Sequence, residues 1–134
     1  MTRIVRPGND LDVLPDAGPP RPPEVCLVIE DRGKVCGYAR LTGLFQHRFL
    51  EHLWVDPACR RQGFASDLMA SVEAEFEGDR LFTSTNESNT AMRTLLAGRG
   101  YRVTGVVENL DDGDPELFLV IYRSELDAGI VAVR

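Results

Sequence analysis

The sequence predicts a mixed α/β fold, in which one open sheet carries helices on its faces. Three observations lead to this fold class. Runs of β-branched and apolar residues, bounded by glycine, proline and aspartate, recur along the chain as expected of strands. Two segments between these runs repeat their apolar residues at helical spacing. Strands that alternate with helices form mixed sheets, and 134 residues, of which 43% are hydrophobic, suit a single domain over residues 1–134.

The amino-terminal segment 1–23 is expected to be an extended loop. Residues 2–5 form a candidate short strand, and six prolines follow before residue 24. Proline lacks a backbone N–H and clashes with the preceding helical turn, so a continuous helix is excluded there.

Three strands are expected next. Residues 24–30 and 35–44 flank the turn Asp31-Arg32-Gly33-Lys34, so residues 24–44 should form a hairpin. Residues 49–55 form a third apolar run, which ends at Asp56-Pro57.

The period then changes to that of a helix, which should begin at Gly63 and end near Gly78. Its apolar stripe consists of Phe64, Ala65, Leu68, Met69, Val72 and Phe76. A strand at 80–85 follows. A second helix should begin at the polar cap 86–89 and end at Gly98, with a buried stripe of Ala91, Met92, Leu95 and Leu96.

The last part of the chain is expected to complete the sheet. Residues 101–109 and 116–123 read as strands on either side of an acidic turn, and residues 129–133 as a further short strand. The strand, helix and strand between residues 49 and 85 should form a parallel crossover.

Charge and cysteine content limit the functional classes. The formal net charge is −6, and no lysine- or arginine-rich run occurs, which argues against a nucleic-acid partner. An acidic protein more readily attracts a cationic partner such as an amine or a basic protein tail. Three cysteines without metal-type spacing indicate reduced thiols in a cytoplasmic protein. No signal peptide or membrane-length apolar run is evident, so no membrane partner is expected.

The segment Arg60-Arg61-Gln62-Gly63-Phe64-Ala65 has the chemistry of an anion site. It lies between a strand and the start of a helix, where backbone N–H groups are unpaired and the helix dipole is positive. Gly63 lets the backbone approach an anion closely, and the two arginines add positive charge. A plain strand-to-helix loop, with glycine as the helix breaker, would give the same local pattern.

The surrounding residues make the pattern more specific. Val55 to Ala65 (VDPACRRQGFA) resembles the acyl-CoA signature of the GCN5-related N-acetyltransferases (GNAT), and Arg60, Gly63 and Ala65 match its fixed positions. Asn89, Leu95 and Gly100-Tyr101 resemble the second signature of that family. The resemblance covers residues 24–123, with an acyl-CoA binding core at 51–101.

The resemblance implies a centrally splayed sheet that binds acetyl-CoA as cosubstrate and needs no metal. The strands 49–55 and 80–85 would separate, with the pantetheine arm between them. Cofactor-binding residues would be Leu53, Trp54 and Val55 through their backbone, Arg60, Arg61, Gln62, Gly63, Phe64 and Ala65 around the pyrophosphate, and Asn89 beside the pantetheine. Asn89 equally suits an ordinary helix cap. An N–H group near Val55 would stabilise the oxyanion.

Glu51 is the candidate catalytic base, because family members place a Glu or His at this register. Strand alternation would place Phe49, Glu51, Leu53 and Val55 on one face, with His47 if the strand begins early. His52 would then point to the opposite face, as would Trp54, in the core; a bulge would change this parity. Glu51 as a solvated strand residue, and His47 or His52 as the base, remain alternatives.

The sequence also departs from the family pattern. Leu96 stands where a tyrosine often acts as general acid, while Tyr101 and Tyr122 read as core aromatics. The helical pair that usually precedes the hairpin is shortened or absent, so the acceptor side would be open or completed by another chain, such as a homodimer partner. The loop 108–116, with five carboxylates, would guide a cationic acceptor or simply form a solvated turn.

The function expected from these observations is N-acetyltransfer from acetyl-CoA to a primary amine of a small molecule or a protein. The alternative is a CoA-binding regulatory or interaction module with little catalysis.

Overall fold

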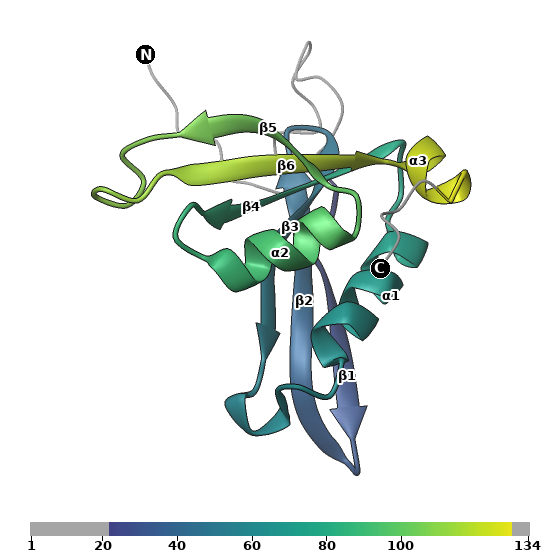
Figure 1. Ribbon diagram of the computed structural model, residues 1–134. Coiled ribbons are helices and arrows are strands. Elements are labelled where there is room, and N and C mark those ends of the chain that lie inside the picture. The colour runs from purple at the N-terminus through teal and green to yellow at the C-terminus, as the bar shows by residue number, and fades with distance from the viewer. Residues whose placement is uncertain (1–21, 130–134) are drawn as a thin grey trace, which may run out of the picture.

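The computed structural model describes residues 22–129, which form one mixed sheet with its helices (Figure 1). The strand expected at 2–5 lies outside the described residues, as does most of the proline-rich segment in which the amino-terminal helical pair was expected to be shortened or absent. The strand expected at 129–133 also lies outside them, apart from Gly129. No helix among residues 22–129 has the length and apolar character needed to cross a membrane.

The sheet has six strands in the order β1-β2-β3-β4-β6-β5. In chain order, the elements are β1 (Val25–Asp31), β2 (Lys34–Leu44), β3 (His47–Val55), the 3-10 turn η2 (Pro57–Cys59), α1 (Phe64–Glu75), β4 (Arg80–Asn86), α2 (Thr90–Gly98), β5 (Arg102–Val107), β6 (Glu116–Tyr122) and α3 (Arg123–Asp127). All neighbouring strands are antiparallel except β3 and β4, which are parallel. The predicted fold class and the parallel crossover are thereby confirmed.

Local chemistry accounts for the ends of these elements. Arg32 and Gly33 both have positive φ, 54° and 78°, which is the geometry of a tight two-residue hairpin turn and is why glycine stands there. The Asn89 side chain accepts a hydrogen bond of 3.1 Å from the Met92 amide and so caps α2, which confirms the cap interpretation. The helix α3 was not predicted. Tyr122 precedes it, and the Glu125 side chain bonds back to the Tyr122 backbone N–H.

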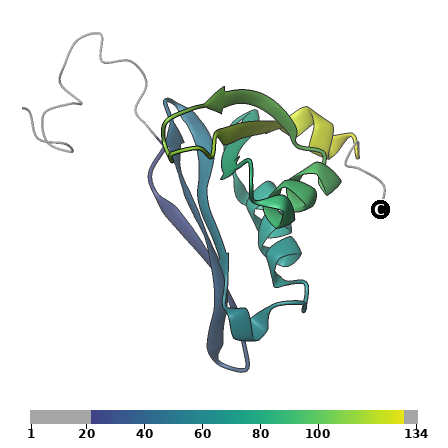
Figure 2. The same cartoon turned by 60° about the vertical axis from the view of Figure 1, so that its left-hand side comes forward.

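Both α1 and α2 lie on the same side of the sheet (Figure 2). The core between them and the sheet includes Ala39, Leu41, Leu50, Leu68, Met69, Val72, Leu81 and Leu96. A side chain at Gly37 would meet the Trp54 carbonyl oxygen at 2.5 Å and a Leu68 methyl carbon at 3.2 Å. This glycine therefore lets α1 approach the sheet closely, which sets the position of the amino-terminal end of α1.

The opposite side, which we call the open face, is not covered by any helix among residues 22–129 (Figure 2). Cross-strand pairs place Tyr38 and Trp54 there, as well as Arg40 and His52. Two aromatic pairs, Phe49 with Phe118 and His47 with Phe82, have ring centroids 5.8 Å apart.

Candidate functional site

The sheet opens between β3 and β4. The two strands pair at only three positions, Arg48 with Leu81, Phe49 with Phe82 and Leu50 with Thr83. Beyond these positions β3 continues to Val55 and β4 to Asn86 without further pairing between the two strands. The splayed centre of the sheet, expected from the resemblance, is present.

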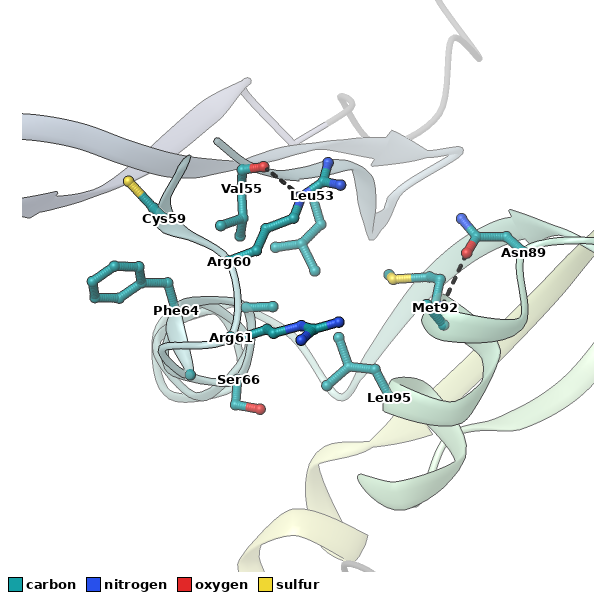
Figure 3. A pocket seen from close by; sticks show the side chains of 13 residues that line it. Leu53, Val55, Cys59, Arg60, Arg61, Phe64, Ser66, Asn89, Met92 and Leu95 are labelled. Atoms are coloured by element: carbon teal, nitrogen blue, oxygen red, sulfur yellow. Dashed lines mark hydrogen bonds between the residues drawn. The ribbon is translucent and has the colours of Figure 1, made fainter. Parts of the chain in front are cut away.

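A cavity of about 420 Å³ lies where the strands have separated (Figure 3). Leu53 and Val55 of β3 form one wall, and Met92 and Leu95 of α2 form the facing wall. The η2–α1 loop closes one end. A long, narrow ligand with an apolar middle and an anionic end fits this combination of surfaces.

The loop end of the cavity has the geometry of an anion site. Arg61 and Gly63 have positive φ, 64° and 82°, so the backbone curls before α1 begins. The first bond of the helix runs from the Asp67 amide to the Gly63 carbonyl, 3.0 Å. The N–H groups of the first turn, from Phe64 on, therefore have no partner within the helix. A Cβ at Gly63 would meet nothing within 4 Å, so the space beside this glycine is open.

Two arginines supply the charge at this end. The Nε of Arg60 donates to the Val55 carbonyl over 3.3 Å, so this side chain folds back along the end of β3. The side chain of Arg61 extends into the cavity towards Leu95 (Figure 3). Both arginines are exposed. Neighbouring guanidinium groups at a helix start favour a bound phosphate or pyrophosphate.

The turn before the loop is held by Asp56. Its carboxylate accepts a hydrogen bond from the Ala58 amide, 2.9 Å, and lies 3.4 Å from the Lys34 ammonium. The Ala58 amide first, and Lys34 next, hold the pKa of Asp56 below its ordinary value. The Asp56 amide donates to the Cys36 carbonyl of β2, 2.8 Å. Because strand backbone groups alternate in direction, the N–H and C=O of Val55 point away from β2, towards the opening.

The structure brings most of the predicted cofactor residues to this cavity. Leu53, Val55, Arg60, Arg61, Gly63, Phe64, Ala65 and Asn89 all line it. Gln62 and Trp54 do not line it. Sequence reasoning missed Cys59 and Ser66, and also Ala91, Met92 and Leu95, which it assigned to the buried stripe of the second helix. The helical stripe of α2 contained Met92 and Leu95 but gave no sign that part of it faces an opening.

The predicted parity of β3 is wrong at Glu51. Arg40 pairs with His52 and Leu41 pairs with Leu50, so Glu51 is an extra residue that forms a β-bulge. Glu51 therefore lies on the open face with His52, away from the face of Leu53. Its carboxylate lies 3.6 Å from the Arg40 guanidinium, and its side chain is 49% exposed. The alternation rule failed because one additional residue reverses the direction of every side chain before it.

The same bulge corrects three further placements. Phe49 and His47 do not lie beside Leu53 but on the open face. On that face Phe49 stacks on Phe118. Trp54 shares the open face with Glu51 instead of pointing away from it, and it is half-buried against Tyr38 rather than in the core. His52 is exposed, and its Nδ1 lies 3.0 Å from the Tyr38 hydroxyl.

Leu96 is fully buried in the core, so no proton donor stands at the position where the resemblance places a tyrosine. Tyr101 is a buried core aromatic, as predicted, and its hydroxyl donates to the Glu73 carboxylate. Tyr122 differs from the prediction: it is half-buried, with the Arg80 and Arg102 guanidinium groups over its ring.

The acidic turn between β5 and β6 is partly occupied by structural bonds. The carboxylate of Asp111 accepts from the Asn86 amide nitrogen, 2.8 Å. The carboxylate of Asp114 accepts from the Ser88 hydroxyl and backbone N–H, 2.5 and 3.1 Å. We call this set of contacts the clasp. It ties the acidic turn to the segment that leads into α2, so two of the five carboxylates are committed to the fold.

No group of three or more metal-ligating side chains occurs within residues 22–129. Cys36 and Cys59 are buried near the loop and Cys26 is exposed; all three thiols are free.

Known proteins provide an independent test of these observations. The sequence matches the model of the Acetyltransferase (GNAT) family over residues 7–101. No curated protein matches it.

Solved structures resemble the chain over most of its length. A GNAT-family acetyltransferase from Bacillus cereus is 33% identical over 73% of this chain and 70% of that chain, with a TM-score of 0.69. Two more distant structures share the fold. They are the ribosomal-protein-S18-alanine N-acetyltransferase of Escherichia coli (19% identity, 83% of this chain and 71% of that chain, TM-score 0.67) and an Elizabethkingia anophelis GNAT-family acetyltransferase with acetyl-CoA bound (16% identity, 72% and 74%, TM-score 0.61).

The family match covers both the curled loop at the start of α1 and the splayed strands beside it, so the chain belongs to the GNAT family of acetyltransferases.

Proposed function

We propose that this protein is an N-acetyltransferase that transfers the acetyl group of acetyl-CoA to a primary amine, carried by a small molecule or by a protein. The observation that carries the proposal is the cavity between the separated β3 and β4, which joins apolar walls to an anion site at the start of α1. The distant Elizabethkingia anophelis structure with acetyl-CoA bound supports the choice of cofactor.

In this proposal the cofactor lies along β3. Its pyrophosphate is held by the unpaired N–H groups of the first turn of α1, with Arg61 reaching into the cavity beside it. The pantetheine arm pairs with the outward backbone groups of Leu53 and Val55 as an additional strand would. The Val55 carbonyl accepts a bond of 3.3 Å from Arg60, and its second lone pair is available to a pantetheine amide.

The reaction needs little beyond placement. The amine nitrogen forms a bond to the thioester carbon, the carbon–sulfur bond breaks, and the electron pair remains on sulfur. A lysine-like amine titrates near pH ~10.4, so a base must take its proton before or during attack. A backbone N–H facing the opening near Val55 stabilises the oxyanion. The buried Leu96 offers no proton, so the thiolate leaves as an anion or takes a proton from water.

We assign the base to Glu51, on the open face beside the point where the strands separate. The cavity that would hold the cofactor is lined by α2 and the start of α1 on the helix face, so in this proposal the acceptor reaches the thioester from the open face. His52 lies on the same face and is the alternative base.

A matched pair of glycine variants tests cofactor binding. Gly63 and Gly78 both have positive φ, 82° and 101°, and a Cβ at either position would meet nothing within 4 Å. Replacing either with alanine therefore imposes a similar backbone strain, of about 1 kcal/mol. Only Gly63→Ala places a methyl group beside the anion site, so it should weaken acetyl-CoA binding at least tenfold in calorimetry, whereas Gly78→Ala leaves the Kd unchanged. Equal effects of the two variants would contradict this cofactor site.

Release of CoA thiol across a panel of amines tests catalysis. The expected result is steady turnover with at least one primary amine, and a loss of about 100-fold in kcat for Glu51→Gln. An unchanged rate and pH profile in Glu51→Gln would remove the assignment of the base.

The second candidate function is a CoA-binding regulatory module. It is favoured by the buried Leu96 and by the ion pair between Glu51 and Arg40. It predicts thermal stabilisation by acetyl-CoA, about 2.7 kcal/mol at 100 times Kd, without thiol release above background for any amine.

A further inference from the structure

Thr83 is the last residue of β4 that pairs with β3, and it is a polar residue in an apolar layer. Its side chain is on the helix face of the sheet and only 1% exposed. Leu81 of the same strand and Leu119 of β6, which share this face, are both buried aliphatic residues. A hydroxyl in such a layer is costly unless it is hydrogen-bonded. The Thr83 hydroxyl donates to the Leu50 carbonyl of β3 over 2.9 Å.

This bond holds one end of the peptide unit that leads into the bulge. The Leu50 carbonyl and the Glu51 N–H belong to the same rigid, planar peptide group. A hydrogen bond to the carbonyl therefore restricts the rotation of that plane, and this plane sets the direction in which the chain enters Glu51. Glu51 follows immediately as the extra residue and points to the open face.

Other contacts hold β3 against its neighbours at this point. Phe49 stacks on Phe118 across the open face with ring planes 20° apart. Leu50 is 1% exposed in the core and also pairs with Leu41 of β2. The strand should therefore stay docked without the Thr83 hydroxyl, whose contribution is the orientation of one peptide.

We propose that Thr83 is a positioning residue for Glu51. Its hydroxyl fixes the Leu50–Glu51 peptide at the place where β3 and β4 separate, and thereby places the Glu51 carboxylate relative to the opening. This inference rests on the proposed function, because Glu51 is the base only if the protein transfers acetyl groups.

The test compares Thr83→Val, which keeps the shape and removes the hydroxyl, with Thr83→Ser, which keeps the hydroxyl. Thr85→Val is the matched control, since Thr85 is buried on the same face of the same strand, two residues further on. If Thr83→Val does not fold, Thr83→Cys replaces it in the comparison with Thr83→Ser. The cysteine side chain is similar in size to threonine, and its thiol is only a weak hydrogen-bond donor.

The first measurement is amide hydrogen exchange by NMR in the protein without cofactor, which does not depend on activity. We expect the amides of Leu50, Glu51 and His52 to exchange about 3- to 10-fold faster in Thr83→Val, and at the wild-type rate in Thr83→Ser. The second is steady-state kinetics. We expect kcat to fall about fivefold or more in Thr83→Val, with the KM for acetyl-CoA within about twofold of wild type and with recovery in Thr83→Ser.

The outcomes separate the two proposals. Absence of turnover in the wild-type protein would overturn the proposed function, while the exchange rates would still decide whether Thr83 holds this peptide. Unchanged exchange and kcat in Thr83→Val, or equal changes in Thr83→Val and Thr85→Val, would overturn the positioning role. A fall in kcat that Thr83→Ser fails to recover would do the same.

Discussion

The β1–β3 part of the sheet and the β4–β6 part differ in how they are stabilised and in where they touch. The first part is a set of antiparallel strands against which α1 packs through apolar side chains, with Gly37 allowing the closest approach. The second part meets the first along three paired positions. Charged groups join the two parts at the far end of α1. This difference explains the cavity. The two parts of the sheet are joined at the far end of α1, and they separate at the other end, beyond the three paired positions of β3 and β4.

The tie at the far end of α1 centres on Glu73. Its carboxylate binds the Arg99 guanidinium through two bonds of 2.6 and 2.9 Å and accepts from the Tyr101 hydroxyl at 3.0 Å. The guanidinium of Arg123 donates to the Glu73 and Phe76 carbonyls, 2.6 and 2.8 Å. Glu73 holds the pKa of Arg99 above its ordinary value. These bonds connect α1 to the end of α2, to the residue before β5 and to the start of α3.

The largest expected effect comes from breaking this tie. Glu73→Ala leaves the Arg99 guanidinium, whose side chain is 11% exposed, without its partner, so we expect a loss of about 3–5 kcal/mol in the free energy of unfolding. Urea denaturation would measure it. Glu75→Ala, on the exposed side of the same helix, is the control and should change stability by less than about 0.5 kcal/mol. A loss below about 1 kcal/mol in Glu73→Ala would show that this carboxylate contributes little to joining the two parts of the sheet.

A second experiment compares one glycine from each half. Gly37→Ala drives a methyl group against the Trp54 carbonyl and Leu68, so we expect a loss of about 1–3 kcal/mol. Gly105 lies in β5, where a Cβ would meet nothing within 4 Å, and Gly105→Ala should lie within about 0.5 kcal/mol of wild type. Urea denaturation of both variants would compare the stability lost where a helix packs tightly on β2 with that lost at the loosely covered edge strand β5. Equal losses in the free energy of unfolding would show that the two sites do not differ in packing.

The buried Tyr101 makes a smaller contribution that depends on pH. Burial first, and the Glu73 carboxylate next, raise the pKa of Tyr101 far above its ordinary value of 10.0. A raised pKa in the folded state gives stability that is complete below the unfolded value and is lost as pH rises beyond it. We therefore expect the unfolding free energy to fall by about 1.4 kcal/mol per pH unit above pH 10 through this group.

Tyr101→Phe isolates that contribution. The hydrogen bond with Cys59, and then burial, raise the pKa of the Cys36 thiol from 9.0 to about 11, which adds a loss of the same sign in both proteins. The difference between wild type and Tyr101→Phe should therefore shrink as pH rises from 10 to 11. A constant difference in urea titrations would mean that Tyr101 ionises freely in the folded protein.

The smallest effect is expected at the clasp. Asp114→Asn weakens two exposed bonds to Ser88, so we expect a loss of about 0.2–1 kcal/mol and an increase of about twofold in the Kd for acetyl-CoA, through a looser start of α2. Asp112→Asn removes the same charge from the same turn and is the control, with no change expected in either quantity. Identical shifts in both variants would indicate an effect of charge rather than of the clasp.

Much of the sheet could be predicted because its signals are local. The hairpin turn at Arg32 and Gly33, the helical stripe of α1 and the cap at Asn89 each depend on a few neighbouring residues. The loop at Arg60 to Ala65 was predictable for the same reason, because the residues that flank it in the sequence make its pattern specific. The bulge at Glu51 was not predictable, because nothing in the sequence of β3 shows which residue its partner strand leaves unpaired. The bonds of Glu73 were not predictable either, because its partners Arg99 and Tyr101 are brought to it only by the fold.

The bulge also bears on which residues the fold requires. Leu50 pairs with Leu41 and His52 with Arg40, so the two strands would form an unbroken ladder if Glu51 were deleted. The sheet would be complete, and Leu53 and Val55 would keep their partners. Glu51 is thus one residue more than the architecture of β3 needs. If deletion of Glu51 left the protein folded but changed its activity, this residue would be required for activity and not for folding.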